Sequence, residues 1–229
     1  MDTSDNIEET KDLDSDFSQT MVDENQDNLL YEVEENKEKP SSKNNYKVLA
    51  RKYRPQNFED LMGQEIMVQT LKNAFKTNRI AHAYILTGVR GIGKTTTARL
   101  LARSLNYETE IINEPNIDML EFGKHCLEIM ESRHIDVIEM DAASRTGIAD
   151  IREIIDSVNY SPSSARYKIY IIDEVHMLSK AAFNGLLKTL EEPPPHVKFI
   201  FATTEVQKIP LTILSRCQRF DLKRFDHDM

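Results

Sequence analysis

The 229-residue chain has few cysteines, no long apolar run and no apolar leader. Its two cysteines, Cys126 and Cys217, are too few for a disulfide framework. No apolar run approaches the ~20 residues that a membrane-spanning helix needs. The N-terminus is acidic and lacks the basic stretch and apolar core of a secretory signal. These absences favour a cytoplasmic protein without a membrane partner.

Negative charge is concentrated at the start of the chain. Residues 1–45 contain 14 Asp and Glu against 4 Lys and Arg, whereas the remainder contains 24 against 25. The overall charge of −9 is therefore a property of this acidic tail. The tail is polar and has no glycine, and we expect it to be disordered. It is either a solvated tail or a docking peptide centred on Leu29, Leu30 and Tyr31.

A glycine-rich motif of the form G-x-x-x-x-G-K-[ST] follows a strand-like segment, 81–86, and precedes a helix-like one, 95–105. Such a loop aims backbone N–H groups at an anion, and the helix N-terminus adds positive charge. Lys94 is then expected to reach the β- and γ-phosphates, and the Thr95 hydroxyl to bind Mg²⁺. The alternative is a glycine-rich turn that matches by chance. The cofactor-binding residues expected here are Gly88, Val89, Arg90, Gly91, Ile92, Gly93, Lys94, Thr95 and Thr96.

An apolar run that ends in two carboxylates is a second signal. Residues 168–174 indicate a buried parallel strand with Asp173 and Glu174 at its end. We expect Asp173 to hold Mg²⁺, usually through water, and Glu174 to polarise the water that attacks the γ-phosphate. The alternative is an acidic pair that caps the next helix.

Strand-like and helix-like segments alternate along the body of the chain. Strands are expected at 81–86, 136–140, 169–172 and 197–202, and helices at 95–105, 148–158, 179–190 and 210–214. Repeated strand–helix units predict an α/β fold with a parallel sheet and helices on both faces. A ligand is then expected at the carboxyl ends of the strands, where Thr95 and Asp173 fall.

Four motifs follow one another in a fixed order: the glycine-rich loop, Asp173 to His176, 202–204 and 215–217. In this order the chain resembles the AAA+ ATPases, and more closely the bacterial clamp-loader ATPases of the DNA polymerase III gamma/tau family. The matching segments are 49–55, 60–64, 81–84, 141–144, 186–193 and 211–219, so that the resemblance covers about residues 46–225. It implies a three-layer α/β/α AAA+ domain with a five-stranded parallel sheet at 46–229, after the tail at 1–45.

The resemblance assigns roles to side chains near the end of the chain. Thr203 or Thr204 matches the residue that orients the attacking water; we take Thr204, and the alternative is strand-end packing. Arg216 matches the arginine finger that acts in trans on the ATP site of a neighbouring subunit, and the alternative is a surface salt bridge. The catalytic candidates are Lys94, Asp173, Glu174, Thr204 and Arg216.

Two further segments are assigned in the same way. Ala50, Arg54 and Pro55 match the segment that lies along adenine and ribose, although a plain turn is the alternative. The segment 144–146 precedes an expected helix and offers DNA phosphate contacts or a simple N-cap. The body is nearly neutral, so no overall basic field attracts nucleic acid.

The chain departs from the family at the position of a zinc module that many members have. The four cysteine positions fall on Tyr107, Leu120, Gly123 and Cys126. One thiolate with the nearby His125 does not make a tetrahedral site, so no zinc is expected. The insert 108–131 is expected to persist as a helical hairpin. The side chains expected to hold it are Ile111, Ile117, Leu120, Phe122, Leu127 and Ile129.

The family continues into a helical lid and an oligomerising collar, so a chain that ends at Met229 is expected to be an N-terminal fragment. The implied function is an ATP-hydrolysing motor, using ATP and Mg²⁺, that loads a sliding clamp onto primed DNA. Its implied partners are delta- and delta-prime-type subunits, the clamp and DNA. Within the polymerase III holoenzyme it is grouped with DNA-directed DNA polymerase, although another subunit polymerises. The alternatives are a remnant that binds without turnover, or another AAA+ DNA machine such as a branch-migration helicase.

Overall fold

The computed structural model describes residues 53–145 and 147–224. The chain divides into two units, Met1–Tyr46 and Lys47–Met229, and every described residue belongs to the second. The acidic tail, Ala50 and Thr146 therefore lie outside the described residues. In the described part, no helix is long and apolar enough to cross a membrane.

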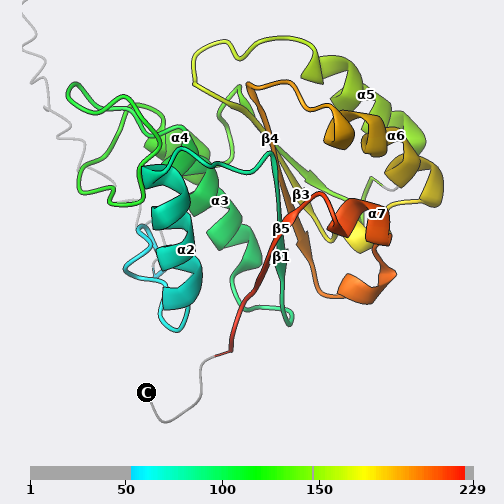
Figure 1. The fold of residues 1–229 in the computed structure, drawn as a ribbon, viewed down its shortest axis with the longest axis horizontal. Helices are drawn as coiled ribbons and strands as arrows, with labels where there is room; N and C mark the ends of the chain where they lie inside the picture. Colours follow the sequence, from blue (N-terminus) through cyan, green and yellow to red (C-terminus); the bar gives the residue numbers. More distant parts are fainter. Residues whose placement is uncertain (1–52, 146, 225–229) are drawn as a thin grey trace, which may run out of the picture. The chain divides into compact units, whose positions relative to one another are not determined.

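Five parallel strands form one sheet in the described part of the chain (Figure 1). They are β1 (Ala83–Thr87), β2 (Val137–Asp141), β3 (Lys168–Asp173), β4 (Val197–Thr203) and β5 (Gln218–Asp221). The strand order is β2-β3-β4-β1-β5. Thr87 of β1 pairs with Thr203 of β4, and Asp141 of β2 pairs with Asp173 of β3. The carboxyl ends of the strands therefore share one edge, as the sequence predicts.

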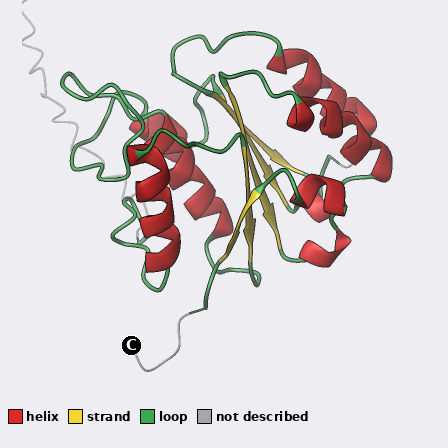
Figure 2. Cartoon of the chain, viewed as in Figure 1, coloured by secondary structure: helices red, strands yellow, loops and turns green. Residues whose placement is uncertain are grey.

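Helices cover both faces of the sheet, which makes three layers (Figures 1 and 2). One face carries α2 (Glu65–Lys76), α3 (Lys94–Leu105) and α4 (Cys126–Met130). The other carries α5 (Ile148–Val158), α6 (Lys180–Glu191) and α7 (Leu211–Leu214). The short 3-10 turns η1 (Val175–Met177) and η2 (Val206–Lys208) follow β3 and β4. The expected α/β/α architecture is confirmed.

Strand β4 shows why the strands appear in the sequence as continuous apolar runs. Phe199 and Phe201 face the α5–α7 side, whereas Ile200 faces the α2–α4 side, and all three side chains are fully buried. Burial of each such side chain contributes about 1.5–3 kcal/mol. The rings of Phe199 and Phe201 also stack, with centroids 5.8 Å apart. A strand covered on both faces has no polar face to alternate with.

Helices α5 and α6 occur where the sequence predicts them, at 148–158 and 179–190. Helix α5 buries Ile151, Ile154 and Val158, one face of a 3.6-residue repeat. Ser179 caps α6, because its hydroxyl oxygen accepts the Ala182 N–H at 3.2 Å. Ser144, in contrast, caps no helix: α5 begins after Gly147, and the Ser144 hydroxyl donates to the Asp141 carbonyl.

The prediction of a helical hairpin at 108–131 is wrong. Only α4 is helical in this insert. The Thr109 hydroxyl accepts the Ile112 N–H at 3.0 Å, and the Asn116 amide oxygen accepts the Asp118 N–H at 2.9 Å. Such local side-chain contacts compete with the hydrogen bonds of a helix. Of the six apolar side chains expected to hold the insert, two are buried and four are exposed; the buried ones are Ile117 and Ile129, and the exposed ones are Ile111, Leu120, Phe122 and Leu127.

A buried carboxylate just before β2 fixes the loop that leads to β3. Asp136 accepts backbone N–H groups from Ser163, Ser164 and Ala165 at 2.6, 2.7 and 2.9 Å. Burial by itself raises the pKa of Asp136, but these hydrogen bonds outweigh it and hold the pKa below its usual value. The ionised carboxylate is therefore the form that stabilises the fold.

Replacement of this carboxylate should lower stability in a pH-dependent way. Asp136→Asn removes a charged acceptor of three backbone donors, so we expect a loss of about 1–3 kcal/mol at pH 7. Because the folded pKa is depressed, this contribution is present above pH ~4 and disappears as the pH falls through the folded pKa. Thermal unfolding of both proteins from pH 7 to pH 3 measures the difference.

Asp118→Asn is the matched control, since Asp118 is an exposed partner of Lys72. It should change stability by less than about 0.5 kcal/mol. Equal losses for the two variants, or a difference for Asp136→Asn that stays constant down to pH 3, would contradict the assignment.

Candidate active site

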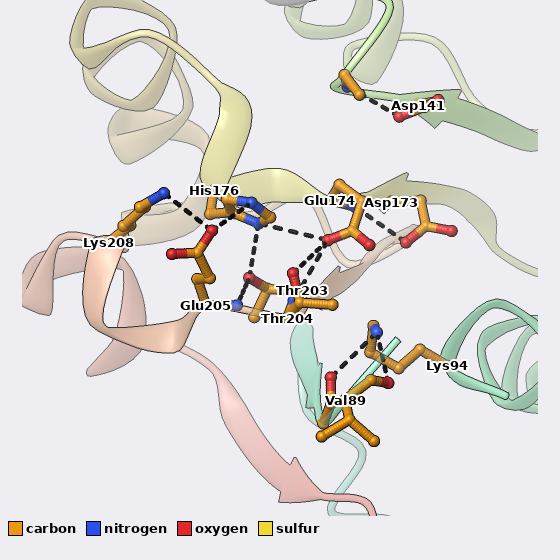
Figure 3. A network of polar contacts seen from close by, with 12 residues as sticks. Val89, Lys94, Asp141, Asp173, Glu174, His176, Thr203, Thr204, Glu205 and Lys208 are labelled. Atoms are coloured by element: carbon orange, nitrogen blue, oxygen red, sulfur yellow. Dashed lines mark hydrogen bonds and ion pairs between the residues drawn. The ribbon is translucent and has the colours of Figure 1, made fainter. Parts of the chain in front are cut away.

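Three segments meet at the carboxyl edge of the sheet. The glycine-rich loop follows β1, Asp173 ends β3 with Glu174 directly after it, and Thr203 ends β4 with Thr204 directly after it. Because β4 lies between β1 and β3, its threonines lie between the loop and the carboxylates (Figure 3). The sheet order therefore brings together segments that are far apart in the sequence.

The loop has the backbone of a phosphate cradle. Gly88 and Gly93 have φ angles of +148° and +98°, which side-chain-bearing residues rarely adopt. A Cβ on Gly88 would also lie 3.2 Å from the Leu222 carbonyl oxygen. Gly93 precedes α3 and provides no side-chain cap to the first N–H groups of that helix. An anion fits these donors and the positive end of the helix.

Lys94 is folded back over the loop. Its side chain is buried, and Nζ donates to the carbonyl oxygens of Gly88 and Val89 at 3.1 and 3.3 Å (Figure 3). An ammonium group has three donors, so one remains for a further acceptor. The lysine is thus held at the mouth of the cradle by weak, neutral partners.

Thr95 and Asp173 are in direct contact. The Thr95 hydroxyl donates to Asp173 Oδ2 at 2.5 Å, and Asp173 Oδ1 accepts the Glu174 N–H at 2.9 Å. Hydroxyl and carboxylate oxygens suit Mg²⁺, which commonly takes one or two protein ligands together with phosphate oxygens and waters. The described residues contain no cluster of three His, Cys, Asp or Glu that could hold a metal by itself. The site therefore fits Mg²⁺ bound with a phosphate ligand.

Glu174 has a strained backbone. Its φ and ψ angles are +46° and +44°, a left-handed conformation that costs a non-glycine residue about 1–3 kcal/mol. Its Oε2 accepts hydrogen bonds from the Thr204 hydroxyl at 3.0 Å and the Thr204 N–H at 3.3 Å (Figure 3). Of the two candidate threonines, Thr204 is therefore the one that contacts this carboxylate.

Thr203 is fully buried and has other partners. Its hydroxyl oxygen accepts the Glu205 N–H at 3.0 Å and lies 3.0 Å from His176 Nδ1. In the sequence, His176 stands out only as part of a motif, and nothing marks Glu205. No spacing in the sequence indicates their contact, because it depends on how β3 and β4 pair.

Arg216 lies apart from these residues. Its guanidinium donates to Glu191 Oε1 and to the Thr212 carbonyl, both at 2.6 Å. None of its contacts in the described part of the chain reaches Lys94, Asp173 or Glu174.

The neighbouring Cys217 is half-buried and packs against the core, and this burial raises its pKa to about 12. The Ser-Arg-Cys motif at 215–217 thus half-buries its cysteine and leaves its arginine at the surface. Arg54 and Pro55, the described part of the expected adenine segment, are half-buried.

Residues 63–226 match the family model described as DNA polymerase III, delta subunit. The chain belongs to this family. It is 55% identical over 181 residues to the DNA polymerase III subunit tau of Escherichia coli, which covers 79% of this chain and 28% of that protein. It is 54% identical over 179 residues to the DNA polymerase III subunit gamma of Buchnera aphidicola. That match covers 78% of this chain and 48% of the Buchnera protein. The resemblance to gamma/tau subunits is confirmed, and the chain spans less than half of either relative.

Two solved structures share the fold. A DNA polymerase III gamma-subunit-related protein from Thermotoga maritima matches with a TM-score of 0.50 and 23% identity, over 69% of this chain and 46% of that one. A single-residue mutant of RuvB from the same organism matches with a TM-score of 0.51 and 19% identity, over 76% and 50%. At these identities the matches support the AAA+ fold alone.

Where many family members are expected to have a zinc module, the insert of this chain packs around a buried arginine. Arg103 is 1% exposed, and its Nε donates to Cys126 Sγ at 2.8 Å. Its guanidinium also lies 4.9 Å from the centroid of the Phe122 ring. The Tyr107 ring is buried beside Gly123, where a Cβ would approach it to 3.2 Å. A buried cation against Cys126, the only cysteine of the insert, repels a metal ion.

Purified protein should accordingly contain no stoichiometric zinc, because Arg103 occupies the space and supplies the charge at this site. Metal analysis by mass spectrometry after dialysis measures the content. A chelator should leave the thermal midpoint unchanged. Close to one zinc per chain would contradict this account and would implicate other ligands, such as His125 and His134.

Proposed function

We propose that this chain is the nucleotide-hydrolysing AAA+ domain of a bacterial DNA polymerase III clamp loader. It binds ATP with Mg²⁺ in the cytoplasm and uses hydrolysis to drive the loading of a sliding clamp onto primed DNA. Its partners are delta- and delta-prime-type subunits, the clamp and DNA. The observation that carries the proposal is the contact between Thr95 and Asp173, which joins the phosphate cradle to the acidic end of β3. The tau and gamma relatives support the clamp-loader assignment.

Binding falls to the loop and the start of α3. The N–H groups of 88–95 and the Lys94 ammonium hold the phosphate oxygens of ATP, with Thr96 in the same first turn of α3. Thr95 and Asp173 would hold Mg²⁺, the carboxylate through water, and the bound ion would supply positive charge to the phosphates of ATP. Arg54 and Pro55, with Ala50, lie along the base and ribose.

Hydrolysis falls to Glu174. Its carboxylate takes the proton of a water whose oxygen bonds to the γ-phosphorus, while the bond from that phosphorus to the bridging oxygen breaks. The products are ADP and inorganic phosphate. Thr204 fixes the direction of the carboxylate through two donors, its hydroxyl and its N–H. Preorganisation of this kind lowers the barrier because no reorientation is needed during reaction.

Arg216 serves the neighbouring subunit. It is at the surface and outside its own pocket, so its positive charge acts on a second ATP only across an interface. Its local partner, Glu191, is the last residue of α6. Both the acidic side chain and the negative end of that helix hold the guanidinium in the separate chain.

Loss of Lys94 should abolish tight ATP binding while the fold persists. Lys94→Ala removes a charged donor to the phosphates, which corresponds to about 1.5–3 kcal/mol, or roughly 10- to 100-fold in affinity. Titration with a fluorescent ATP analogue measures the affinity, and circular dichroism confirms the fold. Lys72→Ala, on the surface of α2, is the control and should bind normally. Unchanged affinity in Lys94→Ala would refute the phosphate-binding assignment.

Loss of Arg216 should affect a neighbour's turnover and not the chain's own affinity. In an assembled complex, Arg216→Ala should lower hydrolysis by up to the ~10³–10⁵-fold attributed to arginine fingers. Glu191→Gln is the matched control, since it breaks the same local ion pair but keeps the guanidinium. If Arg216 only forms a surface pair, both variants should lose similar stability and neither should lose turnover.

A mixture of Arg216→Ala and Lys94→Ala chains tests whether the finger acts in trans. One chain keeps a pocket without a finger, and the other keeps a finger without a pocket. Interfaces that join the intact pocket to the intact finger should recover turnover. No recovery, in a mixture shown to co-assemble, would exclude action in trans.

A further inference from the structure

Polar contacts lead without a break from the Glu174 carboxylate to the turn η2. His176 Nδ1 lies 3.0 Å from the Thr203 hydroxyl oxygen and 3.4 Å from Glu174 Oε2. On the opposite side of the ring, His176 Nε2 lies 3.4 Å from Glu205 Oε1. The same Glu205 oxygen accepts from Lys208 Nζ at 2.9 Å. Figure 3 shows the imidazole between the two carboxylates.

The imidazole is held firmly in this position. His176 lies in η1, two residues after the strained Glu174, and only 6% of its side chain is exposed. Thr203, at the buried end of β4, fixes Nδ1, and its hydroxyl also accepts the Glu205 N–H at 3.0 Å. The ring that contacts the Glu174 carboxylate is therefore nearly enclosed by protein and held through both nitrogens.

The segment beyond Glu205 leads directly to Arg216. Residues 205–216 contain no glycine, and Ile209, just before α7, and Ile213, within it, are both buried in the core. Pro210 fixes the entry to α7, with its carbonyl accepting the Ile213 N–H at 3.0 Å. The chain between Glu205 and Arg216 is therefore short and anchored to the core.

We propose that His176 is a positioning residue that orients the Glu174 carboxylate through Nδ1 and, through Nε2 and Glu205, joins it to the segment that carries Arg216. The inference rests on the proposed function, because the orientation matters only if Glu174 activates water. It gives the two ring nitrogens separate tasks. Nδ1 serves this chain's own ATP site, and Nε2 serves the site of the neighbour to which Arg216 is presented.

The contacts of a second histidine show what a purely structural imidazole looks like in this fold. His196 precedes β4 at the opposite edge of the sheet, and its Nε2 lies 3.1 Å from the Val158 carbonyl oxygen. His176 instead contacts two carboxylates that belong to different turns. The Glu205–Lys208 ion pair is exposed and contributes little to the free energy of unfolding. A gain in stability therefore does not account for the contact between the buried His176 ring and Glu205. The Lys208 ammonium, with help from His176, holds the pKa of Glu205 below its usual value, so this residue stays a carboxylate.

Three substitutions separate the two tasks. His176→Ala removes both contacts. In His176→Asn the amide reaches about as far as Nδ1 of the imidazole, and in His176→Gln it reaches about as far as Nε2. In the assembled complex, His176→Ala should lower kcat for ATP hydrolysis by about 10- to 100-fold, the effect of a misplaced catalytic group. KM for ATP should stay near the parent value, because the contacts of Lys94 and Thr95 are unchanged. His176→Asn should restore more of kcat than His176→Gln.

Controls keep this result distinct from failure of the proposed function. His196→Ala should leave kcat and KM unchanged. Lys94→Ala and Glu174→Gln should abolish turnover, and if neither does, the proposed function itself is wrong. If both do while His176→Ala keeps the parent kcat, the proposed function survives and the role of His176 is overturned. A fall in kcat that neither Asn nor Gln restores, together with a matching fall in thermal midpoint, would show a structural histidine and overturn the proposal as well.

The link to Arg216 is tested in chains that hydrolyse nothing themselves. In a mixture of Arg216→Ala and Lys94→Ala chains, only the Lys94→Ala chain supplies a finger. Adding His176→Asn to that finger-supplying chain should reduce the recovered turnover several-fold, although its own pocket is already inactive. Adding His196→Ala should not. Unchanged turnover with His176→Asn, or no recovery in the parent mixture, would overturn the link.

Discussion

Parallel pairing of β4 with β1 on one side and β3 on the other is the constraint on which the rest of the molecule depends. It places the glycine-rich loop, the two threonines and the two carboxylates at one edge, although they come from three separate parts of the chain. The pairing is maintained by apolar side chains on both faces of β4, so the chemistry of the edge rests on a fully buried strand. Polar groups at that edge are then fixed by neighbours on adjacent strands and need little support from loops.

The sequence predicts those parts of the site that are local. The loop is contiguous and its glycines have conformations that few other residues adopt, and Asp173 ends an apolar run whose length indicates a buried strand. Helices with a clear apolar face, such as α5, are also predicted well. What fails is the insert, where threonine and asparagine side chains bond to nearby backbone and apolar residues stay exposed. The apolar residues of the insert have the spacing of a helix, but most of them have no apolar surface to pack against.

Other features cannot be predicted from the sequence because they arise from contacts between segments that are distant along the chain. Strand β5 is four residues long and mostly polar, and it is a strand only because it pairs with β1. Helix α2 buries Met67 and Leu71 at the spacing of a helix, but no strong cap marks its start. The contact of His176 with Glu205 requires η1 and η2 to lie side by side after β3 and β4. No spacing rule within a single motif encodes it.

If Arg216 serves a neighbouring subunit as proposed, its ion pair with Glu191 must break before the guanidinium can reach a second ATP. Any neighbour that offers a nucleotide phosphate must compete with a carboxylate already in place. The Glu191 carboxylate and the ATP phosphate would compete for the same guanidinium. Because the phosphate carries the larger negative charge, Arg216 would bind a neighbour with ATP in preference to one without it. Salt weakens an exposed ion pair of this kind, so ionic strength also shifts the balance. In the proposed role of Arg216, the end of α6 would hold the guanidinium until the phosphate of an ATP-bound neighbour displaced Glu191.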